Sequence, residues 1–273
     1  AALAGALMSG GVGLTRINLD RCKIGDKGAA ALAAGLGAGC PLVELRLGTN
    51  AISDTGFGKV CAALEGNTTL RVLDVEWNSI RDAEPICRSL RANTCLASVS
   101  LKWNKVGASG ASAIAKVLRP ANYWGKAGGN ATLEHLDISY NEVTAGACFD
   151  IARAVQLSPS LSHLVLSGNP IGDEGAAKVL GGAHGGCKLE RVEMRACGLP
   201  RSGPIPVDAV SDASAIAAGN VAILRHLSPS VLGTLPLPPA PKAQQPQRRA
   251  PTLAELRESR EGGWNSQTKL DPP

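Results

Sequence analysis

The stretch Leu133–Val143 reads LEHLDISYNEV, and it decides the fold because the same spacing of residue types occurs six more times. Leucine stands at its first position, apolar residues at the fourth, sixth and eleventh, and asparagine at the ninth. The other copies are LTRINLDRCKI from Leu14, LVELRLGTNAI from Leu42, LRVLDVEWNSI from Leu70, LASVSLKWNKV from Leu96, LSHLVLSGNPI from Leu161 and LERVEMRACGL from Leu189. Successive starts lie 28, 28, 26, 37, 28 and 28 residues apart, so one structural unit is repeated seven times along residues 14–199.

Each unit begins with an alternation of apolar and polar residues that predicts a short strand with one buried face. In the second unit the buried partners are Leu45 and Leu47. The ninth position carries an amide or a thiol in every unit: Cys22, Asn50, Asn78, Asn104, Asn141, Asn169 and Cys197. A buried asparagine there must pair its side-chain amide with backbone groups where the strand turns away. This column therefore predicts that the units stack on one another.

A helix is predicted between successive strands. The segments 24–28, 52–56 and 171–175 are close copies, and each carries an aspartate near the start of the helix. A carboxylate there can cap free N–H groups and suits the helix dipole. Apolar residues at helical spacing follow, such as Val60 and Leu64.

A strand and a full helix in about 28 residues resemble the long form of the leucine-rich repeat. That form is typical of ribonuclease-inhibitor-like proteins, the Ran GTPase-activating protein and the repeat regions of NOD-like receptors. The resemblance covers residues 14–199. It implies an α/β solenoid, or horseshoe, with parallel strands on the concave side and α-helices on the convex side. It is specific for fold and leaves the function open.

Composition narrows the class of protein. Hydrophobic residues are 44% of the 273 residues but aromatic residues only 3%, so the core is expected to consist of Leu, Ile, Val and Ala. The net charge is +5 with basic and acidic residues interleaved, which argues against a nucleic-acid partner. No apolar run reaches the roughly 18 residues of a membrane helix. The eight cysteines show no CxxC pair, which favours reduced thiols and a reducing compartment. Glycosylation sequons occur at Asn67 and Asn130, but such short motifs are common by chance and do not change the conclusion that the compartment is reducing.

The two ends depart from the repeat. Residues 1–13 match the second half of a repeat helix, which predicts either the remnant of an upstream repeat in a longer protein or a short capping helix. Residues 200–229 are predicted to cover the exposed core with a capping helix over 211–227. Residues 230–273 are proline-rich, which predicts an extended tail.

Two further segments offer candidate contacts. Within the tail a short helix is predicted from Thr252, and its possible anchors are Leu253, Leu256 and Trp264. The fourth unit is about nine residues longer than the others, and the excess must loop outward between its helix and the next strand. Tyr123 and Trp124 lie in that insertion, either as a contact loop or folded back onto the helix end.

The outward face of the strands is the expected contact surface. The eighth position carries an aromatic residue in three successive units, at Trp77, Trp103 and Tyr140. Aromatic rings beside charges are typical of binding hot spots. In ribonuclease-inhibitor-like proteins, aromatic residues at this rim contact the ligand, and the resemblance implies the same role for these three residues. The alternative is that the rings stack and stiffen the rim without a ligand. The predicted contact set adds charged and polar neighbours: Asp74, Glu76, Lys102, His135 and Asp137.

No catalytic constellation is recognisable. The sequence has no phosphate-binding loop and no GxSxG or HExxH motif. The carboxylates of Asp74 and Glu76 are expected on an open surface, where their pKa values have little cause to shift. His135 and His163 occupy equivalent places in adjacent units near Asp137, but two imidazoles without a clear third and fourth ligand make a poor zinc site. We therefore expect neither catalysis nor a cofactor.

Three classes of function remain. The first is a protein-interaction scaffold or a subunit of a hetero-complex in the cytoplasm, with a cytoskeletal or ciliary assembly suggested by analogy with alanine-rich repeats of this kind. The second is a GTPase-activating protein, although a basic proline-rich tail here replaces the acidic segment of the Ran activator. The third is the ligand-sensing repeat region of a NOD-like receptor.

Overall fold

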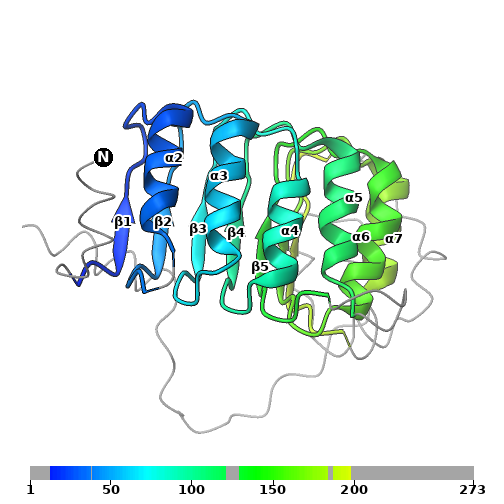
Figure 1. Ribbon diagram of the computed structural model, residues 1–273. Helices are drawn as coiled ribbons and strands as arrows, with labels where there is room; N and C mark the ends of the chain where they lie inside the picture. The colour runs from blue at the N-terminus through cyan, green and yellow to red at the C-terminus, as the bar shows by residue number, and fades with distance from the viewer. Residues whose placement is uncertain (1–12, 38, 121–128, 184–186, 198–273) are drawn as a thin grey trace, which may run out of the picture. The chain divides into compact units, whose positions relative to one another are not determined.

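The computed structural model describes residues 13–37, 39–120, 129–183 and 187–197 (Figure 1). Every strand predicted from the repeat is present, and the strands form one parallel sheet in the order of the sequence. They are β1 (Arg16–Asn18), β2 (Glu44–Arg46), β3 (Val72–Asp74), β4 (Ser98–Ser100), β5 (His135–Asp137), β6 (His163–Val165) and β7 (Arg191–Glu193). Neighbouring strands pair in the register of the repeat, so that residue Arg16 faces Glu44 and Glu44 faces Val72.

One helix follows each of the first six strands, as predicted. The helices are α2 (Gly25–Gly35), α3 (Asp54–Leu64), α4 (Glu84–Ala92), α5 (Gly107–Val117), α6 (Ala145–Leu157) and α7 (Gly172–Gly182). Each packs against the next in chain order, and all lie on one side of the sheet (Figure 1). The other side, which we call the open face, carries the side chains of the third, fifth and seventh repeat positions. Among the described helices none is long and apolar enough to cross a membrane.

The core lies between the sheet and the helices and consists mainly of aliphatic side chains, as the composition predicts. Leu45 and Leu47 of the second unit are at most 1% exposed, whereas Leu14 of the first unit is 37% exposed. Phe57 on α3 is the largest fully buried side chain among the described residues.

The asparagine column forms the predicted ladder. Nδ2 of Asn169 donates to the carbonyl oxygens of Ile138 at 2.9 Å and Leu166 at 2.8 Å. Its Oδ1 accepts the N–H groups of Asn141 at 2.9 Å and Val143 at 3.0 Å. One side chain thus satisfies four backbone groups of two neighbouring units, which accounts for the asparagine at this position in five of the seven units.

The helix-start aspartate Asp26 bonds to the next unit. Helix α2 begins after Ile24 without a side-chain cap. The carboxylate of Asp26 instead reaches the next unit, where it accepts the N–H groups of Ser53 at 2.7 Å and Gly56 at 3.1 Å. These bonds to the ionised form lower the pKa of Asp26, with the Ser53 hydroxyl as the largest contributor. Asp26 thus caps free N–H groups at a helix start, as predicted, but at the start of α3 in the next unit and not at the start of α2.

A second ladder runs along the opposite end of the strands and was missed by the sequence analysis. Asn93, three residues before a repeat start, donates to the carbonyl oxygens of Leu64 at 2.7 Å and Asn67 at 2.8 Å. Its Oδ1 accepts the N–H groups of Cys95 and Leu96. Asn67 and Asn130 hold the equivalent places and are 2% and 3% exposed. The pattern N-x-T-L that resembles a glycosylation sequon is therefore a structural element of the fold.

Three cysteines, Cys61 on α3, Cys87 on α4 and Cys148 on α6, are buried as free thiols. Burial raises the pKa of Cys87 to about 12 and that of Cys148 to about 11. They are neutral at physiological pH and behave as small hydrophobic residues.

Several predictions fall outside the described residues. They are the helix over 1–13, the insertion with Tyr123 and Trp124, the capping helix over 211–227, and the tail with Leu253, Leu256 and Trp264.

Candidate functional site: an aromatic rim beside the open face

The eighth repeat position has a left-handed backbone in every unit. Its φ angle is +52° at Trp77, +55° at Trp103 and +54° at Tyr140. The N–H of Trp77 donates to the carbonyl of Lys102 at 2.9 Å, and the equivalent bond recurs at the other two aromatics. Bulky residues rarely adopt this conformation, and it persists only where the surroundings fix it. Here the strand-to-strand bond and the asparagine ladder at the next position fix it.

The three aromatic side chains form one stack, which we call the aromatic rim. The ring centroids of Trp77 and Trp103 are 4.3 Å apart with planes 16° apart. Those of Trp103 and Tyr140 are 3.9 Å apart with planes 6° apart. These spacings are near the 4.8 Å between strands, so the register of the sheet sets the stack. The rings therefore stack on one another, as the alternative interpretation predicted. That the rim also contacts a ligand remains a prediction.

The two ends of the aromatic rim differ. A Cβ atom at Gly168, the next eighth position after Tyr140, would lie 2.2 Å from the Tyr140 ring, so that ring rests on the glycine backbone. At the other end the Trp77 side chain is 51% exposed. The neighbouring eighth position is Thr49, which is exposed and too short to cover an indole. The rim is closed at Gly168 and open at Trp77.

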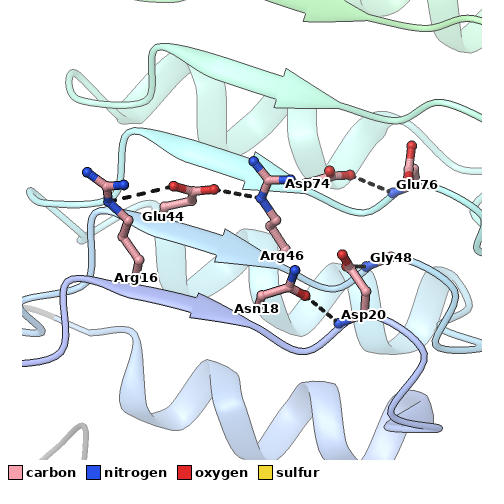
Figure 2. A network of polar contacts seen from close by, with 8 residues as sticks. All are labelled: Arg16, Asn18, Asp20, Glu44, Arg46, Gly48, Asp74 and Glu76. Atoms are coloured by element: carbon pink, nitrogen blue, oxygen red, sulfur yellow. Dashed lines mark hydrogen bonds and ion pairs between the residues drawn. The ribbon is translucent and has the colours of Figure 1, made fainter. Parts of the chain in front are cut away.

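A network of polar side chains lies on the open face along the first three units (Figure 2). Nε of Arg46 is 2.6 Å from Oε1 of Glu44, whose Oε2 is 3.9 Å from Nε of Arg16. One strand away, Oδ1 of Asp20 accepts the N–H of Gly48 at 2.7 Å. Sequence reasoning placed these residues on the open face but left them out of the contact set. The signal that could have found them is glycine at a seventh position, which opens the sheet surface between two carboxylates.

The carboxylates of the predicted set are less open than expected. Asp74 is half-buried among its neighbours, and its Oδ1 accepts the N–H of Glu76 at 3.0 Å. Loss of solvent raises the pKa of Asp74 to about 6, with the nearby charges of Glu76 and Asp20 adding to the effect and Arg46 opposing it. The expectation that these carboxylates have little cause to shift was wrong for Asp74, because side chains on strands about 4.8 Å apart shield one another from water.

The remaining predicted residues lie on the next strands of the open face. Lys102 follows β4, and His135 and Asp137 lie on β5. The ring centroids of His135 and His163 are 6.1 Å apart, and Nδ1 of His135 is 3.2 Å from Oγ of Ser98. Burial lowers the pKa of His135. No group of three or more potential metal ligands occurs within the described part of the chain.

Comparison with known proteins identifies the family to which the chain belongs. Residues 14–33, 66–83, 92–115, 129–152 and 157–180 match the family model described as Leucine Rich repeat. Together with seven strands in repeat register, this decides the family. The chain is a leucine-rich-repeat protein of the ribonuclease-inhibitor-like type.

Curated relatives of this leucine-rich-repeat protein include the ribonuclease inhibitor of Sus scrofa, which is 26% identical over 68% of this chain and 34% of its own length. The NACHT, LRR and PYD domains-containing protein 3 of Bos taurus is 27% identical over 72% of this chain and 19% of its own length. A solved structure of Leiomodin-1 Actin-Binding Site 2 superposes with a TM-score of 0.47 and 18% identity over 55% of this chain and 84% of that chain. The chain thus spans about a third or less of the length of these curated relatives.

The raised pKa of Asp74 has a consequence for stability. Between its ordinary value of 3.8 and about 6 the folded protein binds a proton that the unfolded chain has lost, so stability decreases as pH rises through this range. Asp74→Asn removes the cost of the buried charge. Above pH 6 we expect the variant to be more stable than the wild type by about 1 kcal/mol. This is less than the free energy that corresponds to the whole pKa shift, because solvent screens the charge of a half-exposed side chain.

Urea denaturation at a series of pH values measures this difference. The difference in the free energy of unfolding between Asp74→Asn and the wild type should disappear toward pH 4. Asp137→Asn is the matched control, since Asp137 also accepts a backbone N–H two residues on, from Ser139 at 2.8 Å, but lies two strands away from Asp74. An equal gain at all pH values, or the same gain in the control, contradicts the account.

Proposed function

We propose that this leucine-rich-repeat protein is a non-catalytic interaction module that binds a partner protein through the aromatic rim. One observation carries the proposal: the repeat places three large aromatic residues in a strained backbone conformation at a solvent-facing edge. Gly, Asn or Asp would occupy a left-handed position at lower cost. Because the left-handed conformation occurs in all seven units, the observation that points to a contact is the choice of Trp, Trp and Tyr at this edge, and Trp and Tyr are enriched in interface hot spots.

The partner is proposed to be a protein, and the chain to act as a subunit of a cytoplasmic hetero-complex, with a cytoskeletal or ciliary assembly as the setting. The name of one relative, ribonuclease inhibitor, describes a protein that acts on another protein. The alignment with NACHT, LRR and PYD domains-containing proteins supports a second candidate, the ligand-sensing repeat region of a larger receptor. A GTPase-activating role is the third candidate.

Removing the rim should abolish recognition and leave the fold intact. For the double variant Trp77→Ala, Trp103→Ala we expect binding to weaken by about 2–4 kcal/mol, as for other aromatic hot spots. The loss of ring stacking should cost about 1 kcal/mol of folding free energy. Wild type and variant serve as parallel baits in a cell extract, with quantitative mass spectrometry of the recovered proteins, and the affinity of the rim-dependent protein is then measured after purification.

The control variant is Phe149→Ala, which removes the exposed phenylalanine of α6 from the helix side of the protein. Proteins lost with the rim variant but kept with this control are rim-dependent. Co-assembled structural proteins favour the scaffold, and a single GTPase favours the activating role. A partner with unchanged affinity for the rim variant contradicts the proposal.

A further inference from the structure

The open end of the aromatic rim is an unfinished stack. Trp103 covers one face of the Trp77 ring, and the following ring and glycine continue the column to Gly168. The opposite face of Trp77 points along the same column toward the second unit. The next residue of the column there is Thr49, followed by Arg21 in the first unit, and no other ring is stacked on this face of Trp77 among the described residues. This leaves a gap beside the indole of Trp77, which is 51% exposed. A flat group placed in it would extend the stack.

The walls of this space are acidic. Gly48 separates the seventh positions of the first and third units, and a Cβ atom built on it would lie 2.9 Å from Oδ1 of Asp20 and 3.1 Å from Cγ of Glu76. Two carboxylate side chains thus converge where the second unit has no side chain. Asp74 is the last residue of β3, two residues before Glu76, and interacts electrostatically with both of them.

Within the described residues no ion pair joins a basic side chain to Asp20 or Glu76. Arg46 forms its ion pair with Glu44 at 2.6 Å and also interacts electrostatically with Asp74 and Asp20. Lys102 lies at the seventh position of the next unit, beyond Glu76. Asp20 and Glu76 are therefore two carboxylates without an ion pair close to the free face of Trp77. Charge complementarity specifies a positively charged occupant, and the flat gap specifies a planar one.

We propose that the free face of Trp77 binds an arginine side chain of the partner protein, with the guanidinium stacked on the indole and directed to Asp20 and Glu76. A guanidinium is planar, stacks on aromatic faces and pairs with carboxylates, whereas an ammonium is a compact and strongly hydrated point charge. The inference rests on the proposed function, because it names the chemistry of a partner that binds at the same rim.

The direct test is a titration of the full chain with the blocked peptide Gly-Gly-Arg-Gly-Gly at low ionic strength, followed by the indole N–H signals in ¹H–¹⁵N spectra. The four tryptophans give separate signals that single Trp→Phe variants assign. The Trp77 signal should move in a saturable way while that of Trp264 stays in place. The same peptide with citrulline, which is planar but uncharged, should leave Trp77 unmoved, and the lysine peptide should bind more weakly than the arginine peptide. Equal shifts with citrulline or lysine overturn the proposal.

Two sets of variants locate the binding. The pair Asp20→Asn, Glu76→Gln should weaken arginine binding about three- to ten-fold, whereas the control pair Glu65→Gln, Glu134→Gln removes the same charge from exposed positions elsewhere and should have no effect. Thr49→Arg supplies the missing group from within the chain, in the conformation that Arg21 already adopts with φ +60°, and should block the peptide. Circular dichroism of each variant verifies folding, and no change in affinity with either set refutes the site.

Failure of this inference can be distinguished from failure of the proposed function. If Trp77→Ala, Trp103→Ala loses the partner while Asp20→Asn, Glu76→Gln keeps it at full affinity, the rim binds the partner without an arginine and only the inference fails. If the rim variant itself keeps the partner, the proposed function fails.

Discussion

Phe57→Ala is expected to lower the free energy of unfolding by about 3–5 kcal/mol, the range for removing a fully buried aromatic side chain. Phe57 lies on α3 and is completely buried in the core. Close packing leaves no room for the neighbours to collapse fully into the space, so a cavity adds to the lost burial. Because units of a solenoid stabilise one another only through their neighbours, the loss should also weaken the coupling of the second unit to the first and third. Urea denaturation followed by circular dichroism measures the change.

Phe149→Ala is the matched control, since it removes the same side chain where it is 62% exposed on α6. Exposed substitutions away from special features change stability by roughly 0.5 kcal/mol at most. Similar losses for the two phenylalanines would contradict the assignment of Phe57 to the core and of Phe149 to the surface.

Asn104→Ala should destabilise the protein by a similar amount, about 3–5 kcal/mol, for a different reason. Nδ2 of Asn104 donates to the carbonyl oxygens of Val75 at 3.0 Å and Leu101 at 2.9 Å, and its Oδ1 accepts the N–H of Ile80 at 3.0 Å. Alanine leaves these backbone groups buried and unpaired, and each costs about 1–3 kcal/mol. Asn104 follows β4, the middle strand of the sheet, and bonds to the third unit, so the third and fourth units should separate at lower denaturant concentration.

Two further variants test whether the loss of stability comes from the hydrogen bonds of Asn104 or would follow any substitution in the loop after β4. Lys105→Ala changes the exposed neighbour and should leave the denaturation midpoint nearly unchanged. Asn104→Cys should lose less than alanine, because in the last unit Cys197 directs its thiol to the carbonyl oxygen of Leu166 at 3.4 Å. If cysteine and alanine are equally destabilising, the ladder contributes less than its geometry implies.

The sequence predicted the parts of the fold that depend on one unit repeated in one register. Leu45 and Leu47 alternate with polar residues, and both are buried. The ninth-position asparagines predicted stacking, because a buried amide needs partners that only a neighbouring unit can supply. Both inferences need the period of the repeat and no knowledge of how far one unit is offset from the next.

The predictions fell short where that offset decides the contact. Asp26 lies at a helix start in the sequence, but the offset directs it to Ser53 and Gly56 of the next unit. Asn93 bonds to groups of the preceding unit, and its sequence context gave no reason to expect a second ladder. The pKa of Asp74 depends on its burial and on charged residues of three successive units, Asp20, Arg46 and Glu76.

The candidate site was predictable in position but not in arrangement. Three aromatics at one repeat position had to form a column, because the register of a parallel sheet places equivalent residues side by side. The direction in which the rings point depends on the left-handed backbone at this position. That conformation is a property of the strand end in all seven units and carries no signature in the residue types Trp, Trp and Tyr.

The central claim, that a partner binds at the aromatic rim, is tested most directly by hydroxyl-radical footprinting of the protein with and without its rim-dependent partner. Oxidation of Trp77 and Phe149, both exposed aromatic side chains, is quantified by mass spectrometry in the same sample. The account predicts that the partner lowers the oxidation of Trp77 several-fold and leaves that of Phe149 unchanged. Unchanged oxidation of Trp77 in the saturated complex, or protection of Phe149 alone, would contradict it.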